Sequence, residues 1–143
     1  MTVSAILKAK GGQVVTVPPE TTVAQAIEEL SGRQIGAVVV ADGDGKLLGI
    51  FSERDLVRGL AEAGPSFLDG ELGACMASPV VTCGLDDSER EVMALMTDRR
   101  FRHLPVVDDG KLVGIVSIGD VVKSRIDAAL AEADALRDYI IRG

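Results

Sequence analysis

Aromatic residues and histidine are scarce in this sequence. Tryptophan is absent, and one Tyr and three Phe make up 3% of the 143 residues, whereas apolar residues make up 47%. The core must therefore be built from Val, Ile, Leu and Ala. His103 is the only imidazole, and neither Cys75 nor Cys83 has a recognisable base beside it in sequence, so nucleophilic catalysis lacks its usual partner groups. We expect a protein that is not an enzyme and carries no catalytic cofactor.

The side chains that bind metals are equally few. Two cysteines without a Cys-x-x-Cys spacing and one histidine fall short of a four-ligand zinc site. The acidic turn that begins at Asp42 fails as a calcium loop, because Lys46 and Leu47 stand where a ligand and a glycine belong. We predict no metal site, and two reduced thiols.

Long apolar runs are missing, and positive charge is outnumbered. No stretch approaches the roughly 20 residues of a membrane span, and residues 1–10 hold too short an apolar run for a secretory signal peptide.

Fifteen Lys and Arg against 22 Asp and Glu give a net charge of −7, which disfavours nucleic acid and anionic lipid as partners. We expect a cytoplasmic protein that binds neither nucleic acid nor membrane. A few basic side chains aimed at one small phosphorylated ligand remain compatible with an acidic exterior.

The chain contains an internal repeat. Residues 14–57 align with residues 80–122 at an offset of 66, which falls to 65 after one deletion at Gly43, and 15 of 43 aligned positions are identical. Each copy predicts the order β-α-β-β-α. The expected elements are a first strand (14–17 or 80–83), a helix after an N-cap (Thr22 or Ser88), a buried strand (37–41 or 104–107), a return strand (47–51 or 112–116) and a second helix (55–63, or from 120 onward).

A unit of about 60 residues is marginally stable alone, because it buries a modest share of its apolar surface. We therefore expect an α/β (α+β) fold in which the two repeats pack as a pseudo-twofold pair with a cleft between them. The first repeat is placed at residues 10–66 and the second at residues 76–132, with residues 63–73 as the linker.

The tail after residue 121 is long for a terminal helix and carries an apolar seam. The 4, 3, 4, 3, 4 spacing is typical of a coiled coil and favours a homodimer over packing of the tail on the body. The seam residues are Val122, Ile126, Ala129, Ala133, Leu136 and Ile140.

A Ser-x-x-Asp motif follows the return strand of both repeats, at residues 52–55 and 117–120. On its own this motif is typical of a helix capping box. Its recurrence after Gly49 and Gly114, which permit close backbone approach, points instead to a ligand. Free N–H groups at a helix start attract an anion, and a carboxylate can accept both hydroxyls of a ribose, so the combination suits a nucleotide.

Together, the motifs resemble a tandem pair of CBS domains, the cystathionine β-synthase type of regulatory module also called a Bateman module. The resemblance covers nearly the whole chain. Its segments are residues 14–19, 22–26, 35–40 and 49–55 in the first copy, and residues 76–82, 102–107 and 114–120 in the second.

The resemblance implies a module that binds adenosine ligands such as AMP, ADP, ATP, NAD(H) or S-adenosylmethionine in two clefts and signals their presence to a client protein. It also implies that Asp55 and Asp120 accept from ribose hydroxyls. The first cleft would join Ser52, Arg54 and Asp55 to Thr82, Arg102, His103, Leu104 and Pro105. The second would join Ser117, Gly119 and Asp120 to Thr16, Ile35, Gly36, Ala37 and Val38.

The two implied clefts differ in charge, which predicts unequal affinities. Arg54, Arg102 and His103 could meet phosphates in the first cleft, whereas Gly119 replaces Arg54 in the second. Arg102 and His103 could equally be a solvated cation and a structural contact. The alternative function is a constitutive scaffold or oligomerisation domain that senses no ligand.

Overall fold

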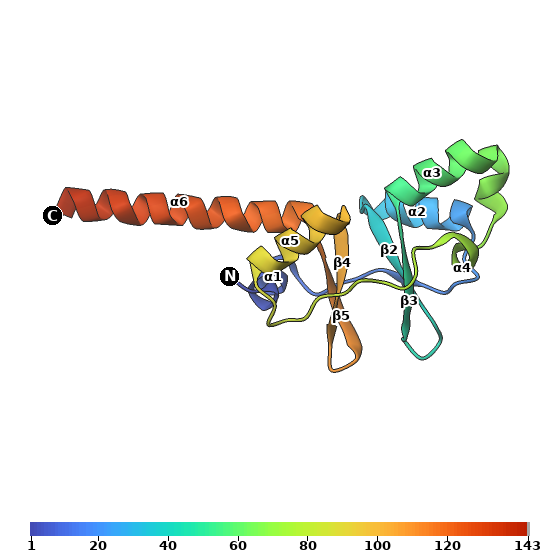
Figure 1. Cartoon of the computed structure of the whole chain (residues 1–143), viewed down its shortest axis with the longest axis horizontal. Coiled ribbons are helices and arrows are strands. Elements are labelled where there is room, and N and C mark those ends of the chain that lie inside the picture. Colours follow the sequence, from blue (N-terminus) through green and yellow to red (C-terminus); the bar gives the residue numbers. More distant parts are fainter. Residues whose placement is uncertain (143) are drawn as a thin grey trace.

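The computed structural model describes residues 1–142, and it consists of two similar halves side by side with one long helix projecting from the second (Figure 1). The order of elements follows the repeat. The elements are α1 (Val3–Lys10), β1 (Thr16–Val17), α2 (Val23–Arg33), β2 (Ala37–Ala41), β3 (Leu47–Ser52), α3 (Glu53–Ala63), the 3₁₀ helix η1 (Gly64–Asp69), α4 (Leu72–Cys75), α5 (Glu89–Arg99), β4 (His103–Asp108), β5 (Lys111–Ser117) and α6 (Ile118–Arg142).

The first half is a three-stranded sheet covered by helices. β1 runs parallel to β2, and β2 pairs antiparallel with β3. All five residues of β2 are buried because the strand lies in the middle of the sheet. The predicted N-cap of α2 is confirmed: the Thr22 hydroxyl accepts from the Gln25 backbone N–H, while the Gln25 side chain accepts from that of Thr22. The predicted N-cap of α5 is also confirmed, because the Ser88 hydroxyl accepts from the Glu91 backbone N–H.

The second half has a two-stranded sheet, and the strand predicted at residues 80–83 is wrong. Only Cys83 of that segment bridges to a strand, at Val106. In the first half the Val39 N–H donates to the Val15 carbonyl at 3.0 Å. Pro105 occupies the position equivalent to Val39 and has no N–H, so the matching hydrogen bond cannot form and the pairing stops.

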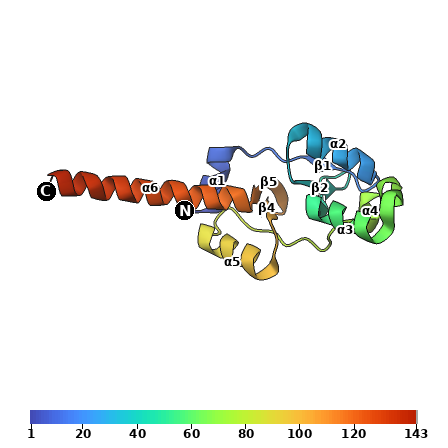
Figure 2. The same ribbon diagram turned by 90° about the horizontal axis from the view of Figure 1, so that it is seen from above.

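The two halves exchange their leading helices. The helix α1 precedes the first half but buries Val3, Ile6 and Leu7 in the core of the second. The helix α4 precedes the second half but buries Leu72 in the core of the first. Both views place α1 beside the second half and α4 at the far end of the first (Figures 1 and 2).

Gly49 and Gly114, which occupy equivalent positions in the two repeats, leave space for side chains of the exchanged segments. A Cβ on Gly114 would lie 2.9 Å from a methyl carbon of Leu7, and one on Gly49 would collide with the side chain of Met76. The close approach predicted for these glycines is therefore made by apolar side chains of the protein. The predicted linker, residues 63–73, is likewise an ordered part of the first half, since η1 and the start of α4 occupy most of it.

The helix α6 is anchored at its start and free along the rest of its described length. Val121 and Ser124 are buried, and the Ser124 hydroxyl donates to the buried Glu89 carboxylate at 2.6 Å. From Arg125 to Arg142 every residue except Ala128 is exposed. The Arg125 guanidinium still reaches the body, because it lies 3.4 Å from the Glu89 carboxylate, and the helix beyond it projects away from the body (Figure 1). No helix within residues 1–142 is both long and apolar enough to span a membrane.

The exchanged contacts predict a large effect of a residue in the expected linker. Leu72 is fully buried, so Leu72→Ala should lower the free energy of unfolding by about 2–5 kcal/mol in urea titrations, since it removes buried methyl groups and leaves a cavity. The control Val57→Ala changes a side chain that is 67% exposed, and should stay within about 0.5 kcal/mol of wild type. Equal effects of the two substitutions would contradict the exchanged core.

Candidate functional site

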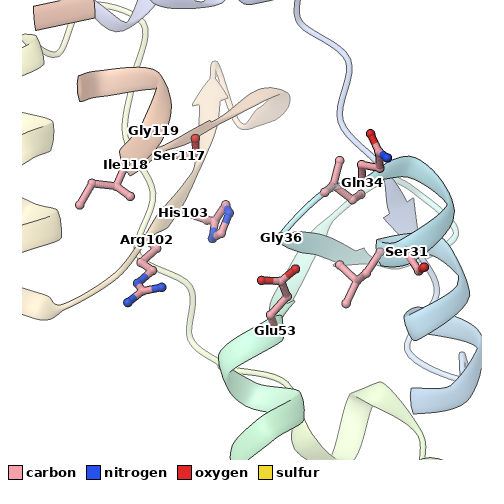
Figure 3. Close-up of a pocket in the computed structure, with 11 residues that line it drawn as sticks. Ser31, Gln34, Gly36, Glu53, Arg102, His103, Ser117, Ile118 and Gly119 are labelled. Carbon is pink, nitrogen blue, oxygen red and sulfur yellow. The ribbon is translucent and has the colours of Figure 1, made fainter. Parts of the chain in front are cut away.

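Two adjoining cavities lie where the halves meet. The larger is about 550 Å³ and the other about 480 Å³, and each takes residues from both halves. Figure 3 shows the larger one, with Gln34, Gly36 and Glu53 on one side and Arg102 and His103 on the other. The two cavities share Gly36, Glu53, Arg102 and His103.

The smaller cavity, called here the arginine cavity, is strongly basic. Its lining holds five arginines and two carboxylates, Glu53 and Asp55, which leaves a formal charge of +3 with His103 neutral, on a chain of net charge −7. Guanidinium groups bind phosphate through paired N–H donors. The arginines are Arg54, Arg58, Arg99, Arg100 and Arg102.

Three of these arginines were not in the predicted site: Arg58, Arg99 and Arg100. The signals that could have found them are simple. Arg58 lies one helical turn after Arg54, so both can face the same side. Arg99 and Arg100 end α5, beside the entry to β4, where the resemblance already placed the first cleft. The Arg54 guanidinium donates to the Arg100 carbonyl at 3.0 Å and thereby joins the two halves.

The Ser-x-x-Asp motif of the first half forms a helix cap at the wall of the arginine cavity. The Asp55 Oδ2 accepts from the Ser52 N–H at 2.9 Å and from the Ser52 hydroxyl at 3.0 Å. The capping interpretation is therefore correct for this motif. Within residues 1–142 no donor reaches the Asp55 Oδ1, so one carboxylate oxygen is available to a ligand.

The second motif forms the same cap and adds a cation. The Asp120 Oδ2 accepts from the Ser117 N–H at 2.8 Å and from the Lys10 ammonium at 2.5 Å. Lys10 also donates to the Ile115 carbonyl at 2.9 Å. Burial raises the pKa of Asp120, but the hydrogen bonds from Lys10 and Ser117 outweigh it, so the pKa lies below its ordinary value. Asp120 is thus an ion-paired carboxylate at neutral pH.

His103 sits at the boundary between the halves. A Cβ on Gly36 would lie 3.0 Å from its Cε1 and Nε2 atoms, so the glycine makes room for the ring (Figure 3). Burial lowers the pKa of His103, and the nearby Lys10 ammonium lowers it further, against the opposing effect of Asp120 and Glu53. The ring is therefore neutral at pH 7 and could accept or donate one hydrogen bond in either cavity.

Both thiols are protonated at neutral pH. Burial, with Asp87 nearby, raises the pKa of Cys83 to about 11. Burial, with Asp55 nearby, also raises the pKa of Cys75. A protonated thiol is a weak nucleophile.

The arginine cavity brings together five of the residues predicted for the first cleft and leaves out three. Of the latter, Leu104 is fully buried in the second core, and the Pro105 carbonyl accepts from the Cys83 N–H. The five are Ser52, Arg54, Asp55, Arg102 and His103, and the three outside are Thr82, Leu104 and Pro105.

The larger cavity corresponds to the predicted second cleft, and again only some of the predicted residues line it. Its further lining residues Leu30, Ser31 and Gln34, at the end of α2 and just beyond it, were not predicted. The predicted residues that line it are Ile35, Gly36, Ser117 and Gly119, and those that do not are Thr16, Ala37, Val38 and Asp120.

Comparisons with family models, curated proteins and solved structures all match this chain to proteins with CBS domains. The CBS domain family matches residues 4–62 and 70–127. The crystal structure of a CBS-domain containing protein from Agrobacterium tumefaciens is 46% identical, covers 87% of this chain and 99% of its own, and has a TM-score of 0.86. The mitochondrial CBS domain-containing protein CBSX3 of Arabidopsis thaliana is 34% identical over 99% of this chain and 73% of its own.

Two more distant structures of similar fold contain adenosine compounds. CBSX2, solved in complex with AMP, is 29% identical with a TM-score of 0.73 and covers 90% of this chain and 98% of its own. The CBS domain pair of protein MJ0100, solved with 5'-methylthioadenosine and S-adenosyl-L-methionine, is 26% identical with a TM-score of 0.77 and covers 90% and 97%. Together with the repeated fold and the composite cavities, these matches show that the chain belongs to the CBS-domain family, as a tandem pair with a long C-terminal helix.

Proposed function

We propose that this CBS pair is a non-catalytic regulatory module of the cytoplasm that binds an adenine nucleotide in the arginine cavity and signals its presence to a client protein. The observation that carries the proposal is the gathering of five arginines around a cavity of about 480 Å³ on an acidic chain. The two relatives solved with AMP and with S-adenosyl-L-methionine support adenosine compounds as the ligand class. The arginines favour a phosphorylated member of that class, such as AMP, ATP or NAD(H).

The residues of the cavity divide into two chemical groups. Asp55 has one carboxylate oxygen available and would accept from the ribose hydroxyls, beside the start of an 11-residue helix. The arginines would meet the phosphates. Because Arg54 and Asp55 belong to one half and Arg99 and Arg102 to the other, a bound nucleotide would contact both halves. It could then change the relation between the halves, provided that it binds the two arrangements with unequal affinity.

The larger cavity would bind the same ligand more weakly. Its motif carboxylate, Asp120, is held by Lys10 and does not line the cavity. A ribose would have to displace the Lys10 ammonium before it could use this carboxylate. The prediction of unequal affinities therefore gains a second physical basis besides the missing arginine at Gly119.

Nucleotide binding can be tested with two arginines at equivalent positions of the repeat. Arg99 lines the arginine cavity, whereas Arg33 pairs with Glu29 on the surface. In calorimetric titrations with AMP, ATP and NAD+, Arg99→Ala should weaken binding about tenfold or more, since a hydrogen bond to a charged group contributes about 1.5–3 kcal/mol. Arg33→Ala should bind like wild type.

Three outcomes would reject this site. Equal effects of Arg99→Ala and Arg33→Ala would place the ligand elsewhere. Binding of S-adenosylmethionine but of no phosphorylated nucleotide would reject the role of the arginines. Failure of every adenosine compound to bind would favour the constitutive scaffold.

His103 supplies a direct reporter of the phosphates. Because it is the only histidine, its imidazole signals in NMR spectra are unambiguous, and its pKa in the free protein should lie below 6.5. A phosphorylated nucleotide should raise this pKa by adding negative charge nearby, and adenosine without a phosphate should raise it less. A free-protein pKa at or above 6.5, or equal shifts with both ligands, would contradict the assignment.

The ion pair that holds Asp120 should make stability depend on pH. The folded-state pKa is lowered, so the charged carboxylate stabilises the native state above its unfolded pKa of about 4, and this contribution is lost as pH falls through the folded pKa. Lys10→Met should lower the free energy of unfolding by about 1 kcal/mol at pH 7. Its difference from wild type should shrink toward zero in acid.

The control for this titration is Lys8→Met, which changes an exposed lysine of the same helix. Its difference from wild type should be small at every pH. A constant Lys10→Met effect from neutral to acidic pH would show that the lysine does not stabilise the fold through its ion pair with Asp120.

A further inference from the structure

The projecting part of α6 exposes a row of large apolar side chains. All six predicted seam residues are exposed, and the four large ones are Val122 (45%), Ile126 (54%), Leu136 (60%) and Ile140 (68%). Most helical stability in proteins comes from packing of an apolar face, and the body of the protein does not cover this face of α6. We therefore expect another helix to cover the apolar seam.

The seam is turned away from the body. At about 100° per residue, the line through Val122, Ile126 and Leu136 lies about a third of a turn from Val121 and Ser124, which pack on the body. A second helix can therefore approach the seam without displacing the anchoring contacts of α6. The small residues at the middle of the seam, Ala129 and Ala133, would let the two backbones come close there.

The charges beside the seam favour one orientation of a second copy. In a parallel pair, a residue flanking the seam lies next to the partner residue five positions later. Glu132 would lie next to the partner's Arg137, and the contact would occur twice by symmetry. In an antiparallel pair centred on residue 130, Arg137 would face Lys123 of the partner subunit, which is repulsive. Glu132 and Arg137 are both exposed, and within residues 1–142 neither forms an ion pair.

We propose that α6 pairs in parallel and in register with α6 of a second copy of this chain, with Glu132 next to the partner's Arg137. The occupant of the seam is thus the same helix of an identical chain. The inference rests on the exposed seam and its flanking charges, and it stands whether or not the arginine cavity binds a nucleotide.

Orientation can be tested by disulfide cross-linking in a Cys75→Ser background, where the remaining native thiol, Cys83, is buried. Leu136→Cys places a thiol on the seam, so mild oxidation should link most chains into dimers through identical positions. Asp138→Cys places a thiol on the far side of the helix and should yield little product. Absence of dimers from Leu136→Cys, or equal yields from the two variants, would overturn the parallel pair.

Charge reversal tests the flanking contacts. Glu132→Arg and Arg137→Glu should each raise the dimer dissociation constant by about tenfold in sedimentation equilibrium, because each variant places like charges together twice. A mixture of the two variants should recover heterodimers, since every flanking pair is then opposite in charge. In an antiparallel pair, Arg137→Glu would instead meet Lys123 of the partner subunit and lower the dissociation constant, and that result would overturn the orientation.

A third variant separates the helix from the rest of the surface. Leu136→Asp should give folded monomers with the circular dichroism and melting transition of an intact body, because Leu136 makes no core contact. A wild-type chain that is still monomeric at a concentration of about 100 μM would overturn the proposal. A Leu136→Asp variant that stays dimeric would overturn it as well.

Discussion

The exchange of leading helices is the constraint on which the rest of the structure depends. Each half has a sheet and helices that leave one part of its core open, and the helix that closes it comes from the segment preceding the other half. The closing residues, Leu7 and Leu72, are buried, and Gly114 and Met76 mark where the exchanged segments meet the strands. Because each half is completed by the segment that precedes the other, the two sheets cannot separate without opening both cores.

Much of this fold could be predicted because its signals are local and repeated. The alignment of the two copies located both β-hairpins and the capped helices after Thr22 and Ser88. The exchange itself could not be predicted in the same way, because a helical pattern shows which residues are buried but not against which core. Val3, Ile6 and Leu7 have helical spacing, yet nothing in that spacing says that they belong to the second half. The loss of the strand at residues 80–83 follows from Pro105, which lies beside that segment in the register set by Cys83 and Val106 and has no N–H to donate.

The candidate site shows the same division between local and distant information. The Ser-x-x-Asp motifs are identical in sequence pattern, and both form caps, yet their carboxylates differ in what surrounds them. Asp55 borders a basic cavity, whereas Asp120 is held by Lys10, a residue 110 positions away. Such a partner is set by the exchange of α1, so no inspection of the motif could reveal it. The same holds for Arg99 and Arg100, whose helix end meets the opposite half only in the folded chain.

The exchanged helices also describe how a duplicated chain of this kind is assembled. In this arrangement a single repeat without the leading helix of the other copy has an incomplete core. Two such chains could close each other by trading helices, as in a domain-swapped dimer. Joining the two units through residues 63–75 turns that encounter between molecules into a reaction within one molecule, at a high effective concentration. The tandem pair thus has the topology of a swapped dimer joined by one peptide connection, and its pseudo-twofold cleft corresponds to the interface that two separate repeats would form.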